Sequence, residues 1–118
     1  VAHSVYKSTK DFFIYRNLGS IRVKGKIEPI QVYELIGKKG EEKENTQKLL
    51  KQFELARQLY LSQKWDDAIN AFQKSNELEN MSDNRQTNPS QTYIKICNEF
   101  KKLSPSSNWD GTYNFKEK

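Results

Sequence analysis

Two lysines flank a glycine in the segment IRVKGKIEPI, residues 21–30, within an otherwise strand-like run. A lysine ammonium on a flexible stem beside a glycine turn can contact a phosphate as a point charge. Charged residues also protect the edge of a sheet against pairing with other chains. The spacing of Lys24 and Lys26 therefore leaves two interpretations open, a phosphate-contacting turn and a solvated hairpin.

Other chemistry is sparse in this sequence. It contains no glycine-rich phosphate loop, CxxC, HExxH or GxSxG motif, and its single histidine, His3, is expected to be a surface or partly packed residue. Cys97 falls on the apolar stripe of a predicted helix, which favours a core residue over a nucleophile. The carboxylates are scattered among lysines, so we predict no catalytic residue and no metal site within the chain.

Length and composition limit the possible classes of protein. A chain of 118 residues that is 35% hydrophobic has room for one domain or two small ones, with a small core. The net charge is +5, but lysines alternate with glutamates, which is typical of solvated helix faces, so no nucleic-acid partner is expected.

The expected location is the cytoplasm. No run reaches membrane-spanning length, and one cysteine fits a reducing compartment. The opening VAHSVYKSTK has neither an initiator Met nor a signal peptide, so we expect a segment of a longer parent protein. Membrane anchoring of that parent is left open.

Aromatic and β-branched residues cluster in DFFIYRNLGSIRV and in PIQVYELI, with turn signals between them, which predicts a β-hairpin. Gly25 permits a tight turn, Pro29 can begin the second strand, and Gly19 indicates a bulge or bend. Because an isolated hairpin is marginally stable, these strands are expected to complete a sheet whose other strands lie upstream of Val1.

The charged segment GKKGEEKENT is predicted to be a linker or the frayed start of a helix. Apolar residues at helical spacing come after it. Asn88 is a plausible N-cap of the last helix, with Pro89 at its first position and Gln91 placed to reach back. The TYNF segment near the end predicts a short strand or aromatics packed on the helices. The apolar faces of the three predicted helices are Leu49, Leu50, Phe53, Ala56, Leu59 and Tyr60; Trp65, Ala68, Ile69 and Phe72; and Tyr93, Ile96, Cys97, Phe100 and Leu103.

The first two predicted helices resemble one tetratricopeptide unit. Small and large residues stand at the offsets that this motif uses to pack its antiparallel helices, at Ala56, Leu59, Ala68 and Phe72. Ser75 and Asn80 depart from the motif, where a small apolar residue and a proline are usual. Since one unit cannot bury its own face, helix 89–103 is expected to cover it.

The run RNLGSIRVKGKIEPIQVYELIG resembles the last strands of the catalytic domain of class III adenylate/guanylate cyclases. In that family an arginine, a Leu-Gly pair, V-K-G-K, a proline and a V-Y-E-L strand follow in this order. Three later segments resemble the C-terminal extension of many bacterial cyclases, namely ARQLYLSQKWDDAINAFQK, NPSQTYIKICNEF and NWDGTYNFKEK. The resemblance covers most of the chain.

This resemblance implies an α+β fold, in which a β-hairpin completes a cyclase-type sheet and a three-helix tetratricopeptide-like module follows. Residues 1–37 would be the C-terminal strands of the catalytic domain and residues 38–46 a charged linker. Residues 47–104 would form the helical module and residues 105–118 a C-terminal tail.

The resemblance also implies an activity for the parent. It would form cAMP or cGMP from ATP or GTP with release of pyrophosphate, using Mg²⁺ or Mn²⁺, as a homodimer whose subunits share each site. Lys24 matches the family position that contacts the β- and γ-phosphates of the nucleotide. The family's metal-binding, purine-selecting and transition-state residues lie upstream, so this segment alone is expected to be inactive and to bind no metal.

A second class of function stays open, in which the helices are a non-catalytic module that binds a protein partner, attached to a degenerate cyclase domain. An exposed apolar groove beside Leu50, Phe53 and Tyr60 would favour that class. Burial of this face by helix 89–103 and Trp109 would instead favour a structural cap on a catalytic dimer.

Overall fold

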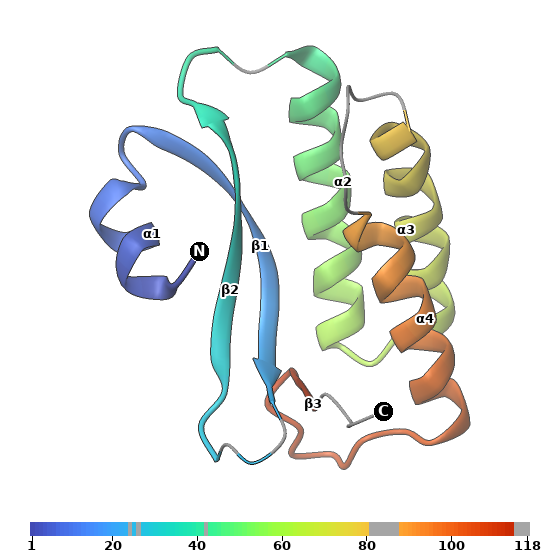
Figure 1. Cartoon of the computed structure of the whole chain (residues 1–118). Coiled ribbons are helices and arrows are strands. Elements are labelled where there is room, and N and C mark those ends of the chain that lie inside the picture. Colours follow the sequence, from blue (N-terminus) through green and yellow to red (C-terminus); the bar gives the residue numbers. More distant parts are fainter. Residues whose placement is uncertain (24, 26, 42, 81–87, 115–118) are drawn as a thin grey trace. The chain divides into compact units, whose positions relative to one another are not determined.

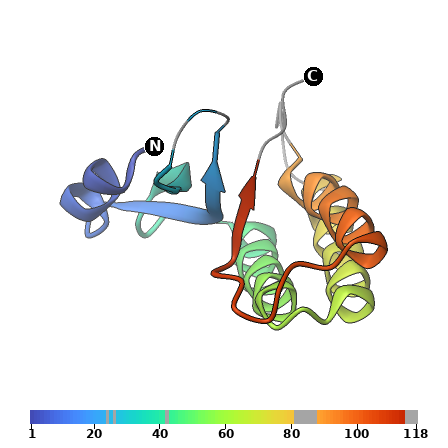
Figure 2. The ribbon, with the colours of Figure 1, turned by 90° about the horizontal axis from the view of Figure 1, so that it is seen from below.

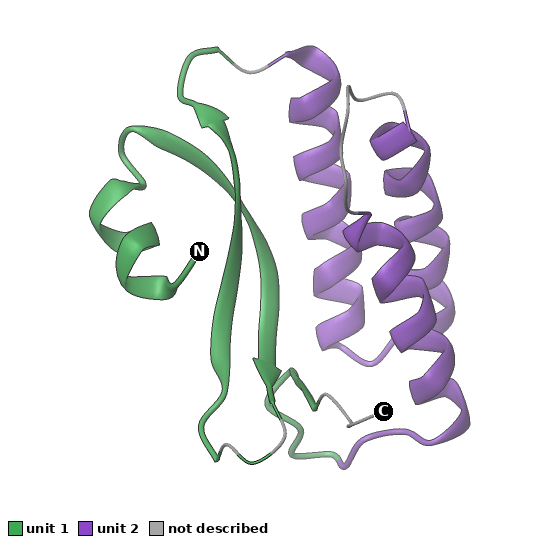
Figure 3. Ribbon diagram, in the orientation of Figure 1, with its two compact units in different colours: residues 1–42, 107–118 green, residues 43–106 purple. Residues whose placement is uncertain are grey.

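The computed structural model describes residues 1–23, 25, 27–41, 43–80 and 88–114. Its elements, in chain order, are α1 (His3–Thr9), β1 (Phe13–Arg22), β2 (Ile30–Lys38), α2 (Glu44–Leu61), α3 (Trp65–Asn80), α4 (Pro89–Lys102) and β3 (Thr112–Asn114) (Figure 1). They form two compact units, residues 1–42 with 107–118, and residues 43–106 (Figure 3). The expected α+β class is confirmed, with a three-stranded mixed sheet in the first unit.

The sheet of the first unit has the strand order β2-β1-β3. β1 and β2 pair antiparallel, as the predicted hairpin requires, and Pro29 directly precedes β2. The register shifts between Asn17 and Gly19, where Gly19 has φ 99°, so the predicted bulge lies at this glycine. β3 confirms the predicted short strand and pairs in parallel with the end of β1, from Ser20 to Arg22 (Figure 2).

Helix α1 was not expected from the sequence. It spans seven residues, has no side-chain N-cap and buries none of its residues, so neither a cap nor an apolar stripe signals it. Aromatic contacts tie it to the hairpin, since Tyr6 stacks on Tyr33 at 3.9 Å between ring centroids. His3 Nδ1 lies 3.0 Å from the Tyr33 hydroxyl, and Val1 exchanges two backbone hydrogen bonds with Tyr33. His3 is therefore an exposed residue that contacts Tyr33, within the surface or partly packed position that was expected.

The second unit contains the three predicted helices around an aromatic core. Phe72 and Tyr93 stack at 4.8 Å, and Phe53 meets both rings edge-on at 5.4 and 5.7 Å. The expected apolar face of α2 is largely buried by these contacts. The prediction that Leu103 belongs to the apolar face of the last helix is wrong. Leu103 follows the end of α4 with an extended backbone and is 78% exposed. No described helix has the length and apolar character that a membrane span requires.

A buried polar network joins α3 to the start of α4. The predicted cap is confirmed, as Asn88 Oδ1 accepts the Gln91 backbone N–H at 3.1 Å. Next to it, Glu79 Oε2 accepts hydrogen bonds from the Ser90 backbone N–H at 3.0 Å and from its hydroxyl at 2.5 Å. Ser75 Oγ lies 2.6 Å from Ser90 Oγ and donates to the Phe72 carbonyl. The serine that departs from the tetratricopeptide pattern is thus hydrogen-bonded in the core.

We expect Glu79→Ala to lower the free energy of unfolding by about 1–3 kcal/mol, because it leaves the buried Ser90 donors without their acceptor. Urea denaturation followed by circular dichroism measures the loss. Glu77→Ala is the matched control, since Glu77 is an exposed glutamate of the same helix. Equal unfolding midpoints for the two variants would contradict the role of this network.

Candidate functional site at the β1–β2 connection

The V-K-G-K sequence lies in the connection between β1 and β2, residues 23–29. Lys24, the predicted phosphate contact, and Lys26 both lie outside the described residues. Gly25 has φ 84°, a conformation that residues with a side chain rarely adopt. A Cβ at this position would meet no atom within 4 Å, so the backbone conformation, and not space, requires the glycine.

Arg22, the last residue of β1, holds the described part of this connection. Its Nε donates to the Ile27 carbonyl at 2.7 Å, across the connection. Its Nη1 donates to Asn114 Oδ1 at 2.8 Å, on β3. We call these two contacts the Arg22 clamp. The guanidinium is engaged within the protein, and sequence reasoning missed this because Asn114 is 92 positions away.

A turn ahead of β3 fixes the start of that strand. Asp110 Oδ1 accepts the Thr112 backbone N–H at 2.9 Å, and the Trp109 indole N–H donates to the Thr112 carbonyl at 2.8 Å. Thr112 Oγ1 lies 3.0 Å from Ser20 Oγ on β1. The hydrogen bond from Thr112 N–H also lowers the pKa of Asp110 below its ordinary value. The Asp110 carboxylate therefore stays charged at neutral pH, and it becomes protonated only as pH falls through that lowered pKa.

An open hollow of about 570 Å³ lies along the described residues of the connection and is lined by Gly25, Ile27, Glu28, Pro29 and Ile30. Ile27 is 88% exposed beside it. These residues offer an apolar wall and one carboxylate. The wall can exclude water from one side of a ligand but supplies no nucleophile.

Arg16 and Glu34, which both belong to the cyclase-like run, face each other across the hairpin. Arg16 is 2% exposed, and its Nε and Nη2 lie 2.8 and 2.6 Å from Glu34 Oε1. A buried charge of this kind needs its partner, because an uncompensated charge in the interior is costly. Burial explains why Arg16 and Glu34 pair, so we assign the pair a structural role. The β1–β2 connection remains the candidate site.

Two other residues singled out in the sequence lie in the helical unit. Cys97 is fully buried, as predicted, and burial raises the pKa of its thiol to about 12. Trp65 stacks on Phe100 at 5.0 Å and meets Tyr60 edge-on at 5.6 Å, so it anchors packing. Trp109 belongs to the sheet unit instead, through its bond to Thr112.

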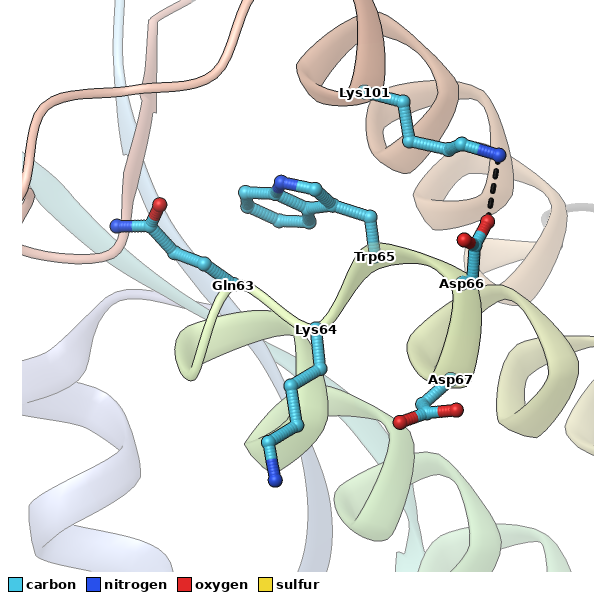
Figure 4. A pocket seen from close by; sticks show the side chains of 6 residues that line it. All are labelled: Gln63, Lys64, Trp65, Asp66, Asp67 and Lys101. Atoms are coloured by element: carbon cyan, nitrogen blue, oxygen red, sulfur yellow. Dashed lines mark ion pairs between the residues drawn. The ribbon is translucent and has the colours of Figure 1, made fainter.

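A second hollow, of about 590 Å³, lies at the start of α3 (Figure 4). Its lining residues are Gln63, Lys64, Trp65, Asp66, Asp67 and Lys101. Lys101 Nζ pairs with Asp66 Oδ1 at 2.6 Å, and the remaining lysine and aspartate balance each other. With no net charge, this hollow selects neither anions nor cations. Across the described ranges, no three His, Cys, Asp or Glu side chains gather as a metal would require.

Cys97 should resist alkylation in the folded protein, because a thiol of pKa about 12 with no exposed surface is almost entirely protonated and inaccessible at pH 8. We expect labelling by iodoacetamide to be slower by about a thousandfold or more than in the unfolded chain, from the thiolate fraction alone. Mass spectrometry with and without urea measures the ratio. Rapid labelling in buffer would place Cys97 at the surface.

No family model, curated protein or solved structure matches this chain.

Proposed function

We propose that this chain is the C-terminal part of a class III nucleotide cyclase, which forms cAMP or cGMP from ATP or GTP and releases pyrophosphate. The observation that carries the proposal is the place of the V-K-G-K sequence. It connects two antiparallel strands, and those strands carry the rest of the cyclase-like run, from Arg16 to Gly37. A connection at the end of a hairpin is a suitable place for a lysine that contacts a phosphate.

In this proposal Lys24 contacts the β- and γ-phosphates and stabilises the negative charge that develops on the leaving pyrophosphate. Mg²⁺ or Mn²⁺ would be held by residues upstream of this chain, and the metal would supply charge neutralisation of the polyphosphate. The catalytic unit is a homodimer in the cytoplasm, and the 118-residue segment alone is inactive.

The helical unit acts in this proposal as a tetratricopeptide-like structural cap. Of the three residues that would have lined an exposed groove, Phe53 and Tyr60 are 1% and 2% exposed, and Leu50 is half-buried. Tyr93 of α4 contacts both rings, at 5.7 and 4.9 Å. Burial of this face supports the cap over a module that binds a partner in a groove.

The test uses the longer protein that contains this chain. We expect Lys24→Ala to lower kcat/KM for cyclic nucleotide formation about tenfold or more with Mn²⁺, which corresponds to about 1.4 kcal/mol of transition-state stabilisation. Cyclic nucleotide and pyrophosphate are measured from both ATP and GTP.

Lys38→Ala is the matched control, because Lys38 is an exposed lysine at the other end of the hairpin, paired with Phe13. Its kcat/KM should equal that of the wild type. Unchanged activity in Lys24→Ala would return the V-K-G-K segment to a solvated hairpin. A wild-type protein that forms no cyclic nucleotide would favour the interaction module.

A further inference from the structure

The connection between β1 and β2 is tied to a strand from the far end of the chain. Arg22 and Asn114 are partners in the parallel register of β1 and β3. The side chain of Arg22 reaches Asn114 with Nη1 and the Ile27 carbonyl with Nε. One guanidinium therefore bridges the connection and the C-terminal strand.

Arginine suits this position for a geometric reason. Its planar group presents Nε–H and Nη–H donors in fixed, divergent directions, so two acceptors on different segments can be bound at once. A lysine has a single nitrogen at the end of a flexible stem and holds such a pair of acceptors less rigidly. The acceptors here are a backbone carbonyl and an amide oxygen, at ordinary hydrogen-bond distances.

The strand that carries Asn114 is itself well anchored. Thr112 is 3% exposed and is held by Asp110, Trp109 and Ser20 through the hydrogen bonds of the turn and of β1. β3 is thus a fixed support on one side of the clamp. The connection, with Gly25 at positive φ and Ile27 exposed, is the side that the clamp restrains.

We propose that Arg22 is a positioning residue, through which the C-terminal strand β3 sets the backbone of the described residues of the β1–β2 connection, Gly25 and Ile27 to Pro29. In this role Arg22 acts through its contacts with Ile27 and Asn114. Its relevance to phosphate binding rests on the function proposed above, whereas the clamp itself is a property of this chain.

The first test is spectroscopic and uses the 118-residue chain. Asn114→Leu removes the acceptor of Nη1 and leaves the backbone pairing of β3 in place. We expect the Arg22 Nη1 protons to exchange with water about fivefold faster, the factor given by the loss of one hydrogen bond of ordinary net strength, and the Nε–H signal to shift because its bond to the Ile27 carbonyl is held less rigidly. The Gly25 and Ile27 amide signals should shift with it.

Two matched variants complete this test. Asn114→Asp keeps an acceptor oxygen and should keep slow exchange at Arg22. Asn98→Leu makes the same change at an exposed asparagine of α4 and should have no effect on Arg22. An Arg22 signal that is unchanged in Asn114→Leu would overturn the clamp, whatever the function of the chain.

The second test measures activity in the longer protein. Asn114→Leu should lower kcat/KM for the nucleotide about fivefold and Asn114→Asp should restore it, while both keep the wild-type melting temperature within about 4 °C. An equal loss in both variants would contradict positioning by the clamp. If Lys24→Ala has no effect while the Arg22 signal still responds to Asn114→Leu, the clamp stands and the cyclase proposal fails.

Discussion

Pairing of β1 on both of its edges is the constraint on which the sheet unit depends. β2 pairs along nearly the whole strand, and β3 pairs only with its last three residues, Ser20 to Arg22. The backbone hydrogen-bonding groups at the end of β1 would otherwise face solvent on one side. β2 precedes residues 43–106 in the sequence and β3 follows them, and both strands pair with β1. The helical unit is therefore inserted, in the sequence, between two strands of one sheet.

The helical unit is held by packing of a different kind. Four rings, Phe53, Phe72, Tyr60 and Tyr93, meet edge-on or stacked at 4.8–5.7 Å, with α4 contributing Tyr93. Aromatic residues bury much area each, which suits a chain that is only 35% hydrophobic. The polar network of Glu79 and Ser90 then satisfies donors at the start of α4, where helical N–H groups lack partners.

The arginines and the lysines of the sheet unit suit different roles, because an arginine has fixed donor directions and a lysine has a flexible point charge. Arg16 and Arg22 each use two nitrogens for polar contacts inside the unit, to Glu34 in one case and to Ile27 and Asn114 in the other. A guanidinium, with its fixed donor directions, is suited to hold such structural contacts. The lysines of the V-K-G-K sequence have the flexible point charge that a phosphate contact needs, and the cyclase proposal assigns that contact to Lys24.

The sequence by itself determined the features that depend on local patterns. These were the hairpin, the bulge at Gly19, the cap at Asn88 and most of the apolar faces of α2 to α4, because period, turn residues and capping residues act within a few positions. Helix α1 carried no such local signal. Only the tertiary structure decided that Thr112–Asn114 pairs with β1 and that Arg22 joins Asn114 to the connection. Contacts between residues 92 positions apart depend on how the chain closes in space, which no short window of sequence contains.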